Sequence, residues 1–350
     1  MRSSTTSFTG VLTARLRRGR VAVGALLLLT AATPIAWAQP RSGGDAHQAR
    51  SPMQQRAAGT TQECFGTGRH IVTPPTGTIT SKYSPDPPSD TTFDATRSTW
   101  RPPLDVYPIG VDTTSSRICW FDGAVYGRIP ADMTWEDAHA HNQPCIRIVA
   151  REWMKVDGVR CDNTGDGFRP RETSTGADNV RMTVRNTYFT RIHDDCLEND
   201  GVIGGLLQNN LWNGCNTGIS EQPGGTSFSQ PVGETLVLDH MLMGLWITPH
   251  EGGAGENSLF KWSGSANNLV IRCSIFKVDA LSLNHAKAMA VPGRIDDSAC
   301  PGQPTTIVWL GGGPYPGDLP SGVRVTSQIG VWTRAVSAWK CSHGYQTLGC

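Results

Sequence analysis

Three consecutive stretches of the chain follow one pattern, in residues 157–171, 185–200 and 208–222. Each runs from a turn that contains Asn or Gly through a short apolar stretch to a polar corner, with a period of roughly 20 to 25 residues and no helical periodicity. Stacked coils of a parallel β-helix require this pattern, because each coil buries its apolar face only against its neighbours. The sequence therefore predicts an all-β fold, a single-stranded parallel β-helix.

The N-terminus has the features of a secretion signal. Four arginines in residues 15–20 precede an apolar stretch at 21–29, and small residues at 36–38 offer a cleavage site. We expect residues 1–38 to be a signal peptide and 39–62 a flexible leader, so that the mature protein is secreted and has no membrane span. The adjacent arginines leave open whether export uses the general or the twin-arginine route.

The remaining residues, 63–350, are expected to form one domain. Several prolines in residues 72–105 favour an extended cover over the surface rather than regular strands. Residues 132–141 predict a short helix that caps the first coil, and 145–280 carry the short strands of the coils. From residue 305 onward we expect a last irregular coil and a short terminal helix.

Ten cysteines are an even number in a chain expected to be exported, so disulfides are the default. No two of them have the spacing of a metal-binding pair. Cys341 and Cys350 are a plausible local pair, whereas Cys196 could equally be a small buried thiol. The connectivity of the others stays open.

A formal net charge of +1 with 17% charged residues argues against a nucleic-acid partner, which requires a concentrated basic face. The 11 Trp residues outnumber the 9 Phe residues, which suits stacking on sugars. Trp212, Trp246 and Trp262 fall in or near the coils. We expect a monomer whose partner is a polysaccharide or a cell-surface glycan.

Two short motifs resemble those of a known family. Asn163–Phe168 and His193–Leu197 are similar to the Asn-Thr-Asp and Asp-Asp-Cys motifs of the polygalacturonase family of glycoside hydrolases, which are right-handed parallel β-helices. The resemblance implies that Asp194 is the general acid and that Asp166 and Asp195 position the attacking water. More loosely, the coil region resembles the wider pectin-lyase-like superfamily.

The chain also departs from the polygalacturonase pattern. Gly165 interrupts the first motif, residues 216–218 lack the family's His, and residues 260–262 are the nearest substitute for its Arg-Ile-Lys signature. These differences weigh against a uronic-acid substrate.

The residues support an acidic corner independently of the family. If Phe168, Leu197 and Ile219 stack inward, the following residues form an outward row, and Asp166, Asp195 and Thr217 form another row at the preceding corner. Carboxylates stacked at the coil spacing of about 4.8 Å repel, which raises at least one pKa and produces the acid and base that glycoside cleavage needs. The predicted catalytic residues are Asp166, His193, Asp194, Asp195 and Glu198, and the predicted substrate-binding residues are Arg169, Arg171, Asp200, Lys261 and Trp262. We expect Asp166, Asp194, Asp195, Glu198 and Arg169 to share one solvent-facing patch.

Three functions stay open. The first is a hydrolase that uses the aspartates and needs no cofactor. The second is a lyase in which Asp166, Asp195 and Glu198 hold Ca²⁺ and Arg169 or Lys261 removes a proton. The third is a non-catalytic glycan-binding or structural protein, in which the corner aspartates only accept backbone N–H groups in turns.

Histidines outside the acidic corner give weaker signals. His139 and His141 could offer two metal ligands on one strand face, but no third ligand follows, so we expect exposed histidines and no metal site. His250 precedes a Gly-rich stretch, 252–255, which we expect to be a surface loop.

Overall fold

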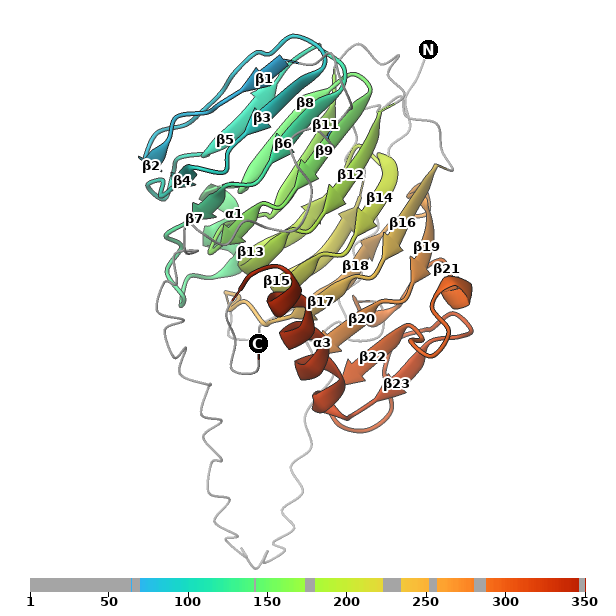
Figure 1. The fold of residues 1–350 in the computed structure, drawn as a ribbon. Coiled ribbons are helices and arrows are strands. Elements are labelled where there is room, and N and C mark those ends of the chain that lie inside the picture. Colours follow the sequence, from blue (N-terminus) through green and yellow to red (C-terminus); the bar gives the residue numbers. More distant parts are fainter. Residues whose placement is uncertain are drawn as a thin grey trace, which may run out of the picture. The chain divides into compact units, whose positions relative to one another are not determined.

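The computed structural model describes residues 64, 70–141, 143–173, 180–222, 234–251, 257–279, 288–345 and 350. The predicted signal peptide and leader, as well as residues 252–255, lie outside these ranges. The described part is mostly β, and its strands form two large sheets in which the paired strands are parallel (Figure 1). None of its helices is long and apolar enough to cross a membrane.

The first sheet has nine strands among the described residues. In spatial order they are β1 (His70–Val72), β3 (Thr91–Asp94), β6 (Ile118–Phe121), β9 (Trp153–Asp157), β12 (Arg181–Arg185), β14 (Gly204–Gln208), β16 (Thr235–Asp239), β19 (Asn268–Arg272) and β21 (Arg294–Ile295).

The second sheet has 14 strands among the described residues. Its main path runs through β2 (Gly77–Ile79), β4 (Ser98–Trp100), β7 (Ala124–Tyr126), β10 (Arg160–Asp162), β13 (Tyr188–Glu198), β15 (Leu211–Glu221), β17 (Leu242–Leu245), β20 (Ile275–Val278), β22 (Thr306–Trp309) and β23 (Arg324–Thr326). A side branch contains β5 (Ile109–Asp112), β8 (Ile146–Ala150), β11 (Phe168–Glu172) and β18 (Ser258–Trp262).

The chain visits the two sheets alternately, and each strand pairs with its counterpart one circuit later, an arrangement compatible with a parallel β-helix. Circuit length varies. Thr187 and Asn210, which occupy equivalent turns, are 23 residues apart, whereas the paired residues Gln208 and Asp239 are 31 apart. The predicted period therefore fits the circuit from β12 to β14, whereas the circuits before and after it are longer.

The turns between the two sheets repeat one backbone conformation. In successive circuits a residue with positive φ follows the first-sheet strand: Asp122, Gly158, Asn186, Asn209, His240 and Cys273. Asp, Asn and Gly tolerate this conformation best. Asn209 Nδ2 also donates to Asn186 Oδ1 at 2.8 Å, so the two asparagines form turns and also connect successive circuits. The predicted Asn turns are confirmed.

Stacked apolar side chains fill the space between the sheets. Phe168 pairs with Leu197, and Leu197 with Ile219, and all three side chains are fully buried. The predicted inward register is therefore confirmed. Gly167 is required here, because a Cβ atom would lie 2.5 Å from the Cys196 carbonyl oxygen and 2.6 Å from the Phe189 ring.

The predicted cover at 72–105 is wrong, because β2 to β4 lie in that range and belong to the two sheets. Its prolines fall in the links between strands, where no ladder hydrogen bond needs an N–H group. The strands thus extend beyond 145–280 on both sides. The predicted tail is confirmed by β22, β23 and the terminal helix α3 (Ile329–Ser342), whose Trp332 and Trp339 pack on the second sheet.

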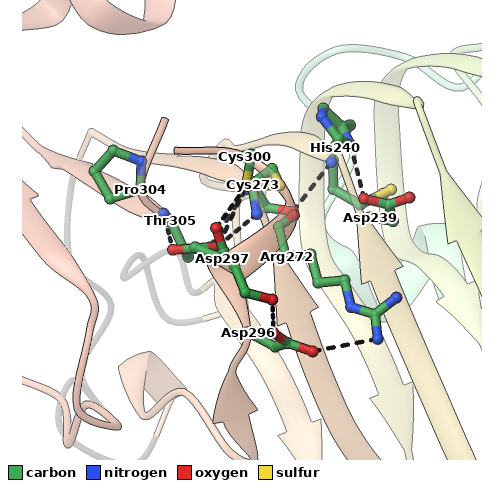
Figure 2. The surroundings of a disulfide bond; sticks show 12 residues. Asp239, His240, Arg272, Cys273, Asp296, Asp297, Cys300, Pro304 and Thr305 are labelled. Atoms are coloured by element: carbon green, nitrogen blue, oxygen red, sulfur yellow. Dashed lines mark hydrogen bonds and ion pairs between the residues drawn. A yellow bond between two sulfur atoms is a disulfide. The ribbon is translucent and has the colours of Figure 1, made fainter. Parts of the chain in front are cut away.

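All ten cysteines are paired, as Cys64–Cys119, Cys145–Cys161, Cys196–Cys215, Cys273–Cys300 and Cys341–Cys350. The predicted pair Cys341–Cys350 is confirmed, and the alternative of a free Cys196 thiol is wrong. Figure 2 shows the Cys273–Cys300 bridge, where Asp297 accepts hydrogen bonds from the backbone N–H groups of Cys273 and Thr305 at 2.6 Å each. Five disulfides suggest an oxidising compartment.

Candidate active site

The candidate site lies where the second sheet bends. β13 and β15 are each 11 residues long, and their later halves pair with the side-branch strands β11 and β18. The register between β13 and β15 shifts between Ile192 and Asp195. Such an irregularity redirects side chains. The adjacent aspartates Asp194 and Asp195 lie at this irregularity.

A short helix, α1 (Trp135–His141), contacts this bend. It lies in the link between β7 and β8 rather than at the first coil, so the predicted cap is wrong although the predicted helix is present. Trp135 Nε1 donates to Asp194 Oδ1 at 2.9 Å, and His139 Nδ1 lies 2.7 Å from Asp194 Oδ2. α1 lies beside β13 (Figure 1), and the buried carboxylate of Asp194 holds it there.

Three aspartates converge beneath α1. Asp166, Asp194 and Asp195 each offer an oxygen within 4.8 Å of the others, and each residue is at most 5% exposed. Lys261 bridges two of them, with Nζ 3.1 Å from Asp195 Oδ1 and 3.4 Å from Asp194 Oδ1. The predicted cluster is therefore present, but the expectation that it faces solvent is wrong.

A row of alternating charges continues from the cluster along the side branch. Arg169 forms ion pairs with Asp166, at 2.5 Å, and with Glu198. Arg171 pairs with Glu198 at 2.9 Å and with Asp200 at 3.4 Å. The side chains of Arg171 and Asp200 are partly exposed, so they form the rim of the site.

The environment drives the pKa values of the neighbouring aspartates apart. Burial and the charge of Asp194 raise the pKa of Asp195 to about 7, although Lys261 opposes the change. Burial alone would also raise the pKa of Asp194, but the His139 hydrogen bond, Lys261 and Trp135 lower it to about 2. At neutral pH, Asp194 is ionised while Asp195 still holds a proton in part of the molecules.

The other two acids of the site also favour their neutral forms. Burial raises the pKa of Asp166, against the effect of Arg169. Burial and Asp166 together raise the pKa of Glu198 to about 10. The site therefore retains protons above the pH at which exposed carboxyl groups lose them.

His193 does not join this cluster, although it is adjacent to Asp194 in sequence. The residue is 1% exposed, its Nε2 lies 2.8 Å from Asn163 Oδ1, and its ring packs against Trp246. Burial lowers the pKa of His193 to about 4, so the ring is neutral. Its place suggests a structural contact rather than the predicted catalytic one.

The three tryptophans in or near the coils make structural contacts. Trp212 is fully buried against Phe189, with ring centroids 5.4 Å apart. Trp262 packs on the core. Trp246 donates to the Ile192 carbonyl oxygen at 2.9 Å.

Sequence reasoning missed Trp135 and His139. His139 is exposed, as expected, but it lies on a helix and pairs with Asp194. The available signal was the spacing of four residues, which places Trp135 and His139 on one helix face, with ring centroids 4.7 Å apart. His250 stacks on the same indole at 5.4 Å.

Comparisons with known protein families, with curated proteins and with solved structures found no match.

Proposed function

We propose that this protein is an exported polysaccharide hydrolase built on a right-handed parallel β-helix of the pectin-lyase-like kind. Right-handed connections between parallel strands of one sheet are nearly universal, which supports the handedness. The five disulfides support export. The substrate would be a polysaccharide or a cell-surface glycan, acted on by the monomer.

One observation carries the catalytic part of the proposal. Asp194 and Asp195 are adjacent, buried and bridged by Lys261, yet their pKa values lie on opposite sides of the ordinary value for aspartate. Glycoside hydrolysis needs one protonated and one ionised carboxyl group beside the bond that breaks. This distribution favours Asp195 as the proton donor rather than Asp194, the residue that the family resemblance implies.

In the proposed reaction Asp195 gives its proton to the glycosidic oxygen as the bond to the anomeric carbon breaks. Asp194, kept ionised, stabilises the positive charge that develops on the sugar ring. Arg169 holds Asp166 and Glu198 in place, and Arg171 with Asp200 contacts the sugar at the rim. No step requires a cofactor.

The test is a panel of polygalacturonate, arabinan, xylan and β-glucan, read by the reducing ends released. Asp195→Asn and Asp194→Asn should each lower turnover by roughly 100-fold or more, while the fold is retained because the amide is nearly isosteric. Arg171→Ala, at the rim, should mainly weaken substrate binding. Glu152→Gln, at an exposed ion pair with Arg117, is the matched control. Full turnover of Asp195→Asn would remove the assignment.

A lyase is the second candidate, and the convergence of Asp166, Asp194 and Asp195 favours it. Oxygens within 4.8 Å of one another can reach one Ca²⁺ at the usual 2.3–2.6 Å. These three residues would hold the ion, which would acidify the proton beside a uronate carboxylate. Lys261 could accept that proton only after losing its own, and Asp195 and Asp194 oppose this loss by raising the pKa of Lys261. Glu198, expected in this set, instead contacts Arg169 and Arg171.

Two readouts separate the candidates. Only a lyase produces unsaturated sugars that absorb near-ultraviolet light, and only a lyase of this kind loses its activity to a chelator. A glycan-binding protein would retain a polysaccharide on a column without releasing reducing ends or unsaturated products.

A further inference from the structure

His139 contacts a buried carboxylate with one side of its ring, and the other side is exposed to solvent. The His139 side chain is 58% exposed, whereas the side chains of the aspartates beneath it are at most 8% exposed. Its Nδ1 is held by Asp194 at 2.7 Å. Its Nε2, at the other side of the ring, has no hydrogen-bond partner within the part of the chain that the structure describes.

The surroundings fix the ring of His139. Asp194 accepts from both Trp135 Nε1 and His139, so its two oxygens hold two groups of one helix face. The indole of Trp135 also stacks on the imidazole at 4.7 Å. An ionised carboxylate at Nδ1 keeps the proton on that nitrogen, which leaves Nε2 as the acceptor in the neutral ring. Asp194 and His139 thus have the arrangement of an oriented base.

We propose that His139 is the catalytic base of the hydrolysis and that Asp194, in addition to stabilising the charge on the sugar ring, positions it. This inference rests on the proposed function and supplies the base that the acid Asp195 lacks. His139 Nε2 takes a proton from a water molecule, and the water oxygen bonds to the anomeric carbon. The glycosidic bond breaks, its electron pair passes to the leaving oxygen, and that oxygen takes the proton of Asp195. Solvent then removes the proton from His139 and returns one to Asp195.

The charges around His139 determine the pH range in which it can act. Its hydrogen bond to Asp194 raises its pKa, the charge of Asp166 acts in the same direction, and burial and Lys261 oppose them. Trp135, the aromatic neighbour of His139, also stacks on His250, and His250 pairs with Glu136 at 2.9 Å. Because only the neutral ring accepts a proton, kcat/KM should rise with pH through the pKa of His139.

The experiment compares His139→Gln with His141→Gln. His141 lies on the same helix and pairs with Asp105 instead of the cluster, so it is the matched control. On a polysaccharide from the panel that the wild type cleaves, kcat and KM are measured across pH 4.5–9. A parallel NMR titration follows the ring protons of His139, assigned by their loss in His139→Gln, in the wild type and in Asp194→Asn.

The expected result is a kcat lower by about 100-fold or more in His139→Gln, with a smaller change in KM and without the rise of kcat/KM on the acid side. His141→Gln should keep the wild-type profile, and Asp194→Asn should lower the pKa of His139. A His139→Gln enzyme that keeps its turnover and its acid limb would overturn this inference while the proposed function stands. A wild type that releases no reducing ends from any polysaccharide would overturn both.

Discussion

The replacement Asp195→Asn tests the protonation of the site without requiring a substrate. The carboxyl group of Asp195 is buried beside ionised Asp194, and its pKa is raised from an ordinary value of 3.8 to about 7. Between these two values the folded protein binds more protons than the unfolded chain, so stability falls as pH rises. The asparagine amide resembles the protonated carboxyl group and does not titrate.

The magnitude follows from the same pKa. At about 1.36 kcal/mol per pH unit, a pKa raised from 3.8 to about 7 corresponds to at most about 4 kcal/mol of stability that the wild type loses between acid pH and pH 8. Water that enters beneath α1 would reduce this value. In a domain of this size the loss corresponds to roughly 8 °C in Tm.

The assay is chemical denaturation of the wild type and of Asp195→Asn between pH 4.5 and 8.5. The variant should match the wild type at the acid end and exceed it by up to about 4 kcal/mol at the alkaline end. Gly264→Ala, which removes no titratable group and adds a Cβ atom with nothing within 4 Å, should keep the wild-type slope. If Asp195→Asn also keeps that slope, Asp195 is ionised throughout and is not the proton donor.

Three further predictions concern neighbouring residues and the disulfides. Lys261→Met leaves Asp194 and Asp195 without their shared cation, so it should lower the free energy of unfolding by about 3–5 kcal/mol at pH 8. The loss should be smaller at pH 5, where Asp195 is protonated, and chemical denaturation that shows equal losses at both pH values would contradict this. Gly167→Ala should destabilise the fold strongly, because its Cβ would lie 2.5 Å from a carbonyl oxygen, whereas Gly264→Ala, with nothing within 4 Å, should have little effect on Tm. Thiol titration of the denatured, unreduced protein should find no free thiol, and several free thiols would be evidence against the five disulfides.

The central strands could be predicted from the sequence because their apolar and polar residues alternate, and only one register buries all the apolar ones. Phe168, Leu197 and Ile219 can all be buried in one register only, and a shift by one residue would expose all three. The same register brings Arg169 beside Glu198. The prediction for residues 72–105 was wrong because prolines in the links between strands were taken as evidence against the strands themselves.

The candidate site was predictable only in part, since its parts come from distant positions in the chain. The three aspartates follow from the register, but His139 meets Asp194 across 55 residues of sequence. No local pattern indicates where the link that contains α1 folds back. His193 was misleading for the opposite reason, because the irregularity in β13 separates it from its neighbour Asp194, although the two are adjacent in sequence.

A buried acidic side chain need not be catalytic, and Glu221 is an example of a structural one. Burial raises its pKa to about 7, as it does for Asp195. However, Glu221 is fully buried and accepts hydrogen bonds from Asn199 at 2.6 Å and from the backbone and side chain of Asn267 at 2.8 and 2.9 Å. These amides satisfy both of its oxygens, so the group links successive circuits and needs no other partner.

The cluster beneath α1 has the opposite character. Neutral amides could have satisfied these corners, yet four acidic groups lie among Arg169, Arg171 and Lys261, where any ionised group loses solvation that its partners only partly replace. Such local conflict costs stability, and proteins retain it mainly where a site requires it. The cluster also differs from Glu221 in having an exposed group, His139, in contact with it. Stability that rises when Asp195 is made neutral, together with activity that falls, is the combination we expect of a site maintained for chemistry.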